Sequence, residues 1–138
     1  MNSEFAIAVH ALVCLSRADA PLSSGRLAKN ICTNPARVRK VVAKLRRAGL
    51  VATKEGAEGG CRFTQNAERT TLLEILDAVE TRVVCAAWRS GSADLPCLIA
   101  AGMADVMDEL YDSLNQACRN ELSRVTVADL VRKIFANA

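Results

Sequence analysis

The sequence lacks the features that mark several large classes of protein. No segment reaches the roughly 18 to 20 consecutive apolar residues that a membrane-spanning helix needs, and the N-terminus lacks the basic start and apolar run of a secretory signal. The chain has a single histidine and no GxSxG, P-loop or dinucleotide-binding motif, so the machinery for catalysis is thin. We therefore expect a soluble cytoplasmic protein that is not an enzyme and has no membrane partner.

The six cysteines include no CxxC pair. They are scattered through segments with a helical pattern, in a chain of 138 residues that is 51% apolar and can bury a core without disulfides. Reduced thiols are therefore expected, and a special role for any one cysteine needs its own evidence.

Charge is divided unevenly along the chain. Residues 1–65 hold 11 Lys and Arg against 4 Asp and Glu, whereas residues 66–138 hold 7 against 11. A solvated charged surface is one interpretation, and a surface for a polyanion is the other. The regular structure predicted for the basic half favours the polyanion.

Three helices are predicted in the basic half. The first spans residues 5–17, where Phe5, Val9, Leu12 and Leu15 form an apolar stripe. A short second helix, capped by Ser23 or Ser24, ends near residue 31. The third begins with a Thr-Asn-Pro cap and ends at Gly49.

The third helix combines an apolar face with a basic one. Its core face is predicted to hold Val38, Val41, Val42 and Leu45. Cations recur at spacings of three and four residues along another face, at Arg37, Lys40, Lys44 and Arg47.

Two short β-like runs follow, residues 50–55 and 61–64, around the glycine-rich loop GAEGG. Three helices and a two-stranded hairpin are typical of a winged helix-turn-helix, in which the third helix enters the DNA major groove. The predicted fold is therefore mainly α with a small β-hairpin wing (α+β), extended by a long dimerisation helix.

The DNA contacts predicted from this arrangement fall into two groups. Arg37 is the best candidate to read a base, since arginine can donate twice to guanine, followed by Asn34, Arg39 and Lys40. Phosphate contacts are predicted for Lys44, Arg47, Lys54 and Arg62, and the interface is completed by Ser24, Thr33, Gly59 and Gly60.

The acidic half is predicted to be mostly helical. A helix over residues 71–80 is followed by a loop, residues 81–97, and by a long helix from Leu98; a short helix over residues 127–135 is expected to pack back on the DNA-binding end. We expect a DNA-binding domain at residues 1–65 and a second unit at residues 66–138. The long helix carries a heptad-like seam of Met103, Met107, Leu110, Leu114 and Ala117.

The seam predicts a homodimer, which suits a palindromic DNA site. Packing of the seam against its own domain is the alternative. An adaptor that uses the long helix to dock another protein is a further class, and it could coexist with DNA binding.

Several stretches resemble the Rrf2 family of bacterial winged-helix transcription regulators. They are FAIAVHAL, TNPARVRKVVAKLRRAGLV, the wing GAEGG, TLLEILDAVE and the LPC before the long helix. The resemblance implies a homodimer that binds a palindromic operator, usually as a repressor, and senses redox state, nitric oxide or iron–sulfur supply. One departure is Cys61, since the family wing usually continues Gly-Gly-Tyr.

Cluster-binding members of the family carry three closely spaced cysteines before the long helix. This loop has only Cys85 and Cys97, so no cofactor is expected. The alternative is an iron–sulfur cluster on those two cysteines, completed by His10 or Glu4.

We expect instead that the oxidation state of cysteine thiols is the signal to which the protein responds. Cys97 lies at the start of the long helix, where the helix dipole favours a thiolate, and Cys32 lies just before the basic helix. The placement and the resemblance together suggest that Cys32 and Cys97 of opposite subunits form a disulfide on oxidation and so weaken operator binding. Cys61 is a third redox candidate, whereas Cys14 and Cys118 are expected to pack as small apolar residues. Control by nitric oxide, a small ligand or a protein partner is the alternative.

Overall fold

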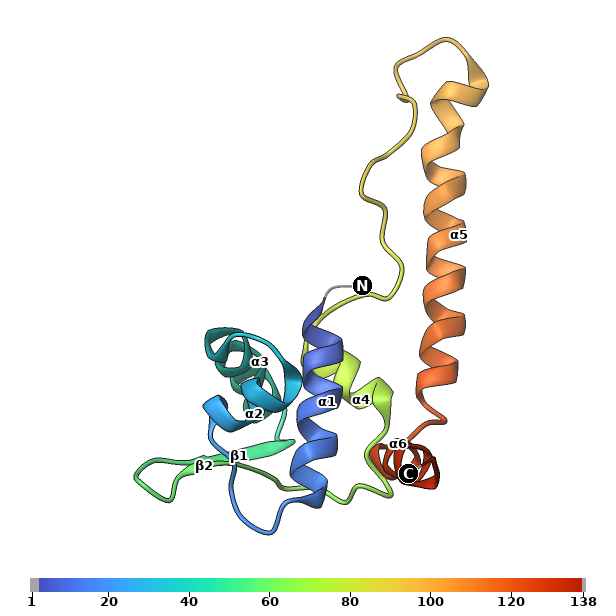
Figure 1. Cartoon of the computed structure of the whole chain (residues 1–138). Helices are drawn as coiled ribbons and strands as arrows, with labels where there is room; N and C mark the ends of the chain where they lie inside the picture. Colours follow the sequence, from blue (N-terminus) through green and yellow to red (C-terminus); the bar gives the residue numbers. More distant parts are fainter. Residues whose placement is uncertain (1–2, 138) are drawn as a thin grey trace.

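The computed structural model describes residues 3–137, and Figure 1 shows their arrangement. The elements within these residues are α1 (Ser3–Arg17), α2 (Ser24–Ile31), α3 (Pro35–Arg47), β1 (Val51–Lys54), β2 (Gly60–Phe63), α4 (Leu72–Ala78), α5 (Leu98–Leu122) and α6 (Val127–Ala136). The predicted fold, mainly helical with a two-stranded hairpin, is confirmed.

Local capping explains where four of the described helices begin. The Ser23 hydroxyl accepts from the Arg26 amide at the start of α2, and the Asn34 side chain accepts from the Ala36 amide at the start of α3. Both α4 and α6 begin with a capping box, Thr71 with Glu74 and Thr126 with Asp129. These caps satisfy backbone amides that have no partner inside the helix.

One apolar core unites α1, α2, α3, α4 and α6. Its fully buried side chains come from every one of these helices, and they include Leu12, Leu27, Val38, Leu45, Ile75 and Val127. All four predicted core residues of α3 are buried. The core runs across residue 65, the predicted boundary between the two units. We call these five helices and the hairpin the head.

Backbone hydrogen bonds attach α6 to the start of α4. The Leu72 amide donates to Val125 O at 2.9 Å, and the Val127 amide donates to Thr70 O at 3.0 Å. The C-terminal helix therefore packs back on the head, which contains the predicted DNA-binding helices, as its sequence predicts.

The hairpin is antiparallel, with Val51 opposite Phe63 and Lys54 opposite Gly60. Leu22 adds a third, one-residue strand, because its amide and carbonyl each pair with Cys61, at 2.9 and 2.8 Å. The wing is thus hydrogen-bonded to the residue just before the cap of α2.

The long helix α5 stands away from the head, as Figure 1 shows. Among its described residues only Asn115 is buried, while Leu98, Ile99 and Leu110 are 88%, 72% and 49% exposed. We call α5 together with residues 80–97 the stalk. None of the described helices is both long enough and apolar enough to cross a membrane.

Polar contacts hold the loop of the stalk along α5. The Asn115 amide group accepts from the Val84 amide at 2.8 Å and donates to Val84 O at 2.6 Å. Farther along, Arg82 pairs with Asp112 and Arg89 with Asp108. At the base of α5, Arg119 pairs with Asp77 of α4 and joins the stalk to the head.

Candidate DNA-binding interface

The predicted interface lies on one side of the head. Figure 1 shows α2, α3 and the hairpin together on the side of α1 that faces away from α5. The apolar face of α3 enters the core, so most of the remaining surface of the helix is left to the solvent. This is the arrangement in which a recognition helix and a wing can meet DNA together.

The N-terminus of α3 positions two of the predicted base-reading residues. Asn34 is the N-cap, so its side-chain oxygen is already bonded to the Ala36 amide at 2.7 Å. The Arg37 guanidinium is exposed and bonds only hydroxyl groups, Oγ of Ser3 and Oγ1 of Thr33, in the contacts found among residues 3–137. A guanidinium on neutral, exposed partners can exchange them for a base edge or a phosphate.

The Glu4 carboxylate of α1 engages two cations of α3. Lys44 Nζ lies 2.6 Å from one oxygen of Glu4, and Lys40 Nζ lies 3.0 Å from the other. The hydrogen bond from Lys44, and then the one from Lys40, holds the pKa of Glu4 below its usual range. The cations of α3 are therefore not equally available to DNA.

Lys44 and Lys40 differ in exposure. The Lys44 side chain is 19% exposed and also donates to Val79 O, whereas the Lys40 side chain is 68% exposed. Lys44 thus fastens α3 to α1 and α4, a role that differs from the phosphate contact predicted for it.

The other predicted cations are open to solvent. Within the described part of the chain, no carboxylate pairs with the side chains of Arg39, Arg47, Lys54 or Arg62, and all four are exposed. Ser24, the first residue of α2, and Thr33, in the turn between α2 and α3, are both half-buried. The interface is thus carried by α3 and by both strands of the wing.

Steric contacts with the backbone explain why residues 59 and 60 of the wing are glycines. A Cβ on Gly59 would lie 2.2 Å from Lys54 O, and one on Gly60, whose φ is +144°, would lie 2.5 Å from Leu22 O. Any other residue at Gly60 would push the hairpin away from Leu22.

Arg26 is a further candidate for the interface, one that the sequence alone does not indicate. It is exposed in the first turn of α2 and borders a hollow with Ser23, Lys54 and Gly59 of the wing. The helical pattern of α2 does not distinguish Arg26 from an arginine that is merely exposed to solvent. The hairpin, folding back beside α2, supplies the second cation.

The three redox candidates have different environments. Cys32 is exposed in a left-handed conformation, φ 62°, in the turn between α2 and α3. Cys97 is exposed at the N-cap of α5, where the amides of Ala100 and Ile99 lower the pKa of its thiol. Cys61 is 3% exposed in β2, and burial raises the pKa of its thiol.

The residues of the alternative iron–sulfur site are not brought together in one chain. His10 bonds the Asn30 side chain in the head at 2.8 Å, while Cys97 lies at the end of α5 farthest from the head (Figure 1). No group of three His, Cys, Asp or Glu that could hold a metal occurs among residues 3–137. These side chains therefore do not fit an iron site within one chain.

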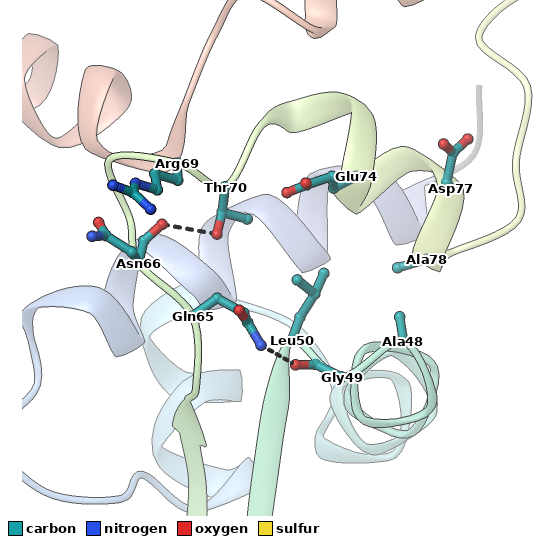
Figure 2. Close-up of a pocket in the computed structure, with 10 residues that line it drawn as sticks. All are labelled: Ala48, Gly49, Leu50, Gln65, Asn66, Arg69, Thr70, Glu74, Asp77 and Ala78. Atoms are coloured by element: carbon teal, nitrogen blue, oxygen red, sulfur yellow. Dashed lines mark hydrogen bonds between the residues drawn. The ribbon is translucent and has the colours of Figure 1, made fainter.

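A second hollow lies between the end of α3 and α4, and Figure 2 shows its lining. Gln65 and Thr70 donate to Gly49 O and Asn66 O, both at 2.9 Å. Its two carboxylates are engaged, Glu74 in capping α4 and Asp77 with Arg119. Its lining includes no cysteine, serine or histidine, so no nucleophile–base pair of the common kinds is present there.

Comparison with known proteins agrees with this geometry. A family model described as "Rrf2: Iron-dependent Transcriptional regulator" matches residues 1–133. A Bacillus subtilis protein, YwnA, named as an HTH-type transcriptional regulator, is 27% identical over 98% of this chain and 99% of its own length.

Solved structures of similar fold include the following two. A transcriptional regulator from Lactobacillus plantarum matches with a TM-score of 0.82 at 24% identity, over 97% of this chain and 91% of its own. CymR, the global cysteine regulator of B. subtilis, matches with a TM-score of 0.70 at 18% identity, over 96% of both chains. The chain is therefore a DNA-binding protein and not an enzyme, and it belongs to the Rrf2 family of bacterial transcriptional regulators.

Proposed function

We propose that the chain is a homodimeric repressor of a palindromic operator, released from DNA when Cys32 of one subunit and Cys97 of the other form a disulfide. The observation that carries the DNA-binding part is the set of exposed cations without carboxylate partners, among residues 3–137, on α3 and the wing. The elements that carry these cations, α3 and the hairpin, lie together on the side of the head that faces away from α5 (Figure 1).

Roles within the interface follow from the contacts of each side chain. Arg37, at the start of α3, reads a base, and Arg39 and Lys40 support it. Arg26, Arg47, Lys54 and Arg62 contact phosphates. Asn34 and Lys44 act by holding the helix in place.

The dimer is supported by the apolar stripe of α5. Met103, Leu110 and Leu114 are 38%, 49% and 43% exposed, although they follow the spacing of a helix-pairing seam. A second α5 would cover these side chains and place two heads on two half-sites.

The redox step needs an oxidant and two thiols. Each thiol loses a proton and one electron, the S–S bond forms, and an oxidant such as diamide or hypochlorous acid accepts the two electrons. The exposure of both cysteines and the lowered pKa of Cys97 support this pair, whereas burial disfavours Cys61. The bond would fix the spacing of the two α3 helices and spoil their match to the half-sites.

Fluorescence anisotropy on the DNA upstream of its own gene tests DNA binding first. We expect selective binding that weakens with salt along a log–log slope of roughly −5 to −8, as for six to nine phosphates. Arg47→Ala should reduce the slope by about 1, and Lys44→Met should leave it unchanged. Arg37→Ala should lower operator discrimination by about 1 to 3 kcal/mol, and a uniform loss on all sequences would make it a phosphate contact.

The same titration after diamide, reversed by dithiothreitol, tests the switch. Release by oxidation, with an intersubunit adduct in intact-mass spectra that Cys32→Ser abolishes, is the expected result. Equal binding in both states would contradict the cysteine switch but not the regulatory role. The signal would then be a cluster, a small ligand or a protein partner.

A further inference from the structure

A groove of about 890 Å³ lies between α1 and α6, on a part of the head that the DNA-binding interface does not use. Figure 1 shows α6 beside α1, on the side opposite α3 and the wing. The volume is within the range of pockets that hold small organic molecules.

The floor of the groove is apolar. Side chains from three helices line it: Phe5, Val9, Val13, Leu72, Leu130 and Ile134. Ile134 and Phe135 at its edge are 56% and 53% exposed, which leaves apolar surface open to water. An occupant with an apolar body would remove that surface from water.

The charged groups of the groove are all cations. Arg17 and Lys133 lie in the lining, which includes no carboxylate, and neither has an ion-pair partner among residues 3–137. The Arg17 guanidinium stacks over the Phe135 ring at 4.5 Å, so one cation is held directly above the apolar edge. This pattern complements a molecule with an apolar body and one negative group.

A polar contact inside the groove joins α1 to α2, the first helix of the helix-turn-helix. Oδ1 of Asn30 accepts from His10 Nε2 at 2.8 Å and from the Cys14 thiol at 3.2 Å, and all three residues line the groove. Burial raises the pKa of Cys14, so the thiol keeps the proton that it donates. Asn30 belongs to the last turn of α2, two residues before Cys32, so this contact joins α1 to the helix-turn-helix.

We infer that the α1–α6 groove is a binding site for an amphipathic organic anion, an aromatic or aliphatic body carrying one carboxylate or sulfonate. The apolar floor takes the body, and Arg17 and Lys133 take the negative group. A helix from a second copy of the chain is the competing occupant, and the experiment below separates the two.

The test uses the full chain and two fluorescent probes of matched shape, the anionic anilinonaphthalenesulfonate and the neutral phenylnaphthylamine. Both should bind saturably, one per chain. Lys133→Gln should weaken the sulfonate about two- to fivefold, the size of an exposed charge pair, and leave the neutral probe unchanged. Lys29→Gln, which removes an exposed lysine outside the groove, is the matched control.

Ala6→Trp tests the place of binding, because Ala6 is exposed and lines the groove, so a larger side chain can fill it without entering the core. We expect loss of both probes, with the circular dichroism and the sedimentation coefficient of the chain unchanged. Equal binding to wild type and Ala6→Trp would overturn the site.

Failure of both probes on wild type, together with a shift to monomer in Ala6→Trp, would assign the groove to a second copy. Neither readout needs operator DNA, so a result that contradicts the groove as a binding site does not bear on the proposed function.

Discussion

The head and the stalk are built on different interactions. Side chains such as Leu12, Val38 and Ile75 are completely buried in the head, and five helices share one core. In the stalk, the described apolar side chains of α5 remain at least partly exposed, and its loop is held by Asn115 and by arginine–aspartate pairs. The comparison teaches that apolar burial within one chain completes the head, whereas the stalk leaves apolar surface exposed, which the proposed dimer would cover.

The largest effect is expected where the stalk meets its proposed partner. Leu110→Ala removes about 2 kcal/mol of packing from each subunit, so the dimer Kd should rise roughly a thousandfold. Sedimentation velocity over a concentration series measures it. Glu109→Ala, one residue off the seam, is the control, and an unchanged Kd in Leu110→Ala would show that the seam faces something other than a second α5.

A core substitution in the head should destabilise the chain by nearly as much. Ile75→Ala empties a fully buried position at the junction of α4 with the core and should cost about 3 kcal/mol in the free energy of unfolding. Urea denaturation followed by circular dichroism measures the loss. Ile99→Ala in the stalk, 72% exposed, should change it by less than about 0.5 kcal/mol. Equal losses would contradict the distinction between the two regions.

Removing the buried amide of the stalk should have an intermediate effect. Asn115→Ala leaves the amide and carbonyl of Val84 without their partner and should cost about 1 to 2 kcal/mol. Hydrogen exchange should speed up in residues 80–97 and stay unchanged in α1. Gln116→Ala, a neighbouring exposed position, should change neither rate, and protection retained in Asn115→Ala would mean that other contacts hold the loop.

The smallest effect concerns the ion pairs of the head. The pKa of Glu4 is lowered in the folded chain, so its contribution is fully present above the unfolded-state pKa and is lost as the pH falls through the folded-state value. Glu4→Gln should therefore lower stability near neutral pH by less than about 1 kcal/mol and reduce the loss below about pH 4.5. Thermal unfolding between pH 6 and 3, with Glu55→Gln as control, measures it. A parallel curve for Glu4→Gln would exclude a role for this carboxylate.

The fold was largely predictable because its signals are local. Pro35 after a capping Asn34, the glycine-rich wing and the three- and four-residue spacing of α3 each specify an element from adjacent residues. Helix ends agree closely for the same reason: α1 is helical from Ser3, the first residue that the structure describes, and ends at the predicted Arg17.

The candidate site was less predictable because its contacts join distant segments. Lys44 and Glu4 are 40 residues apart, so the helical pattern of α3 alone made Lys44 equivalent to its exposed neighbours. The burial of Cys61 depends on pairing with Leu22, and the place of Arg26 depends on the wing folding back beside α2. Cys97 was the exception, since a cap at the start of a helix is a local feature. The dimer contacts remain a prediction.

The bridge between Leu22 and Cys61 has a consequence for DNA geometry. Leu22 immediately precedes the cap of α2, so the wing and the helix-turn-helix are joined by backbone hydrogen bonds as well as by the core. In the proposed complex, the separation between the major groove that α3 would read and the phosphates that the wing would reach is therefore a fixed dimension of the protein. An operator can match or miss that dimension, and in the proposed dimer any adjustment to the distance between half-sites would fall to the stalks.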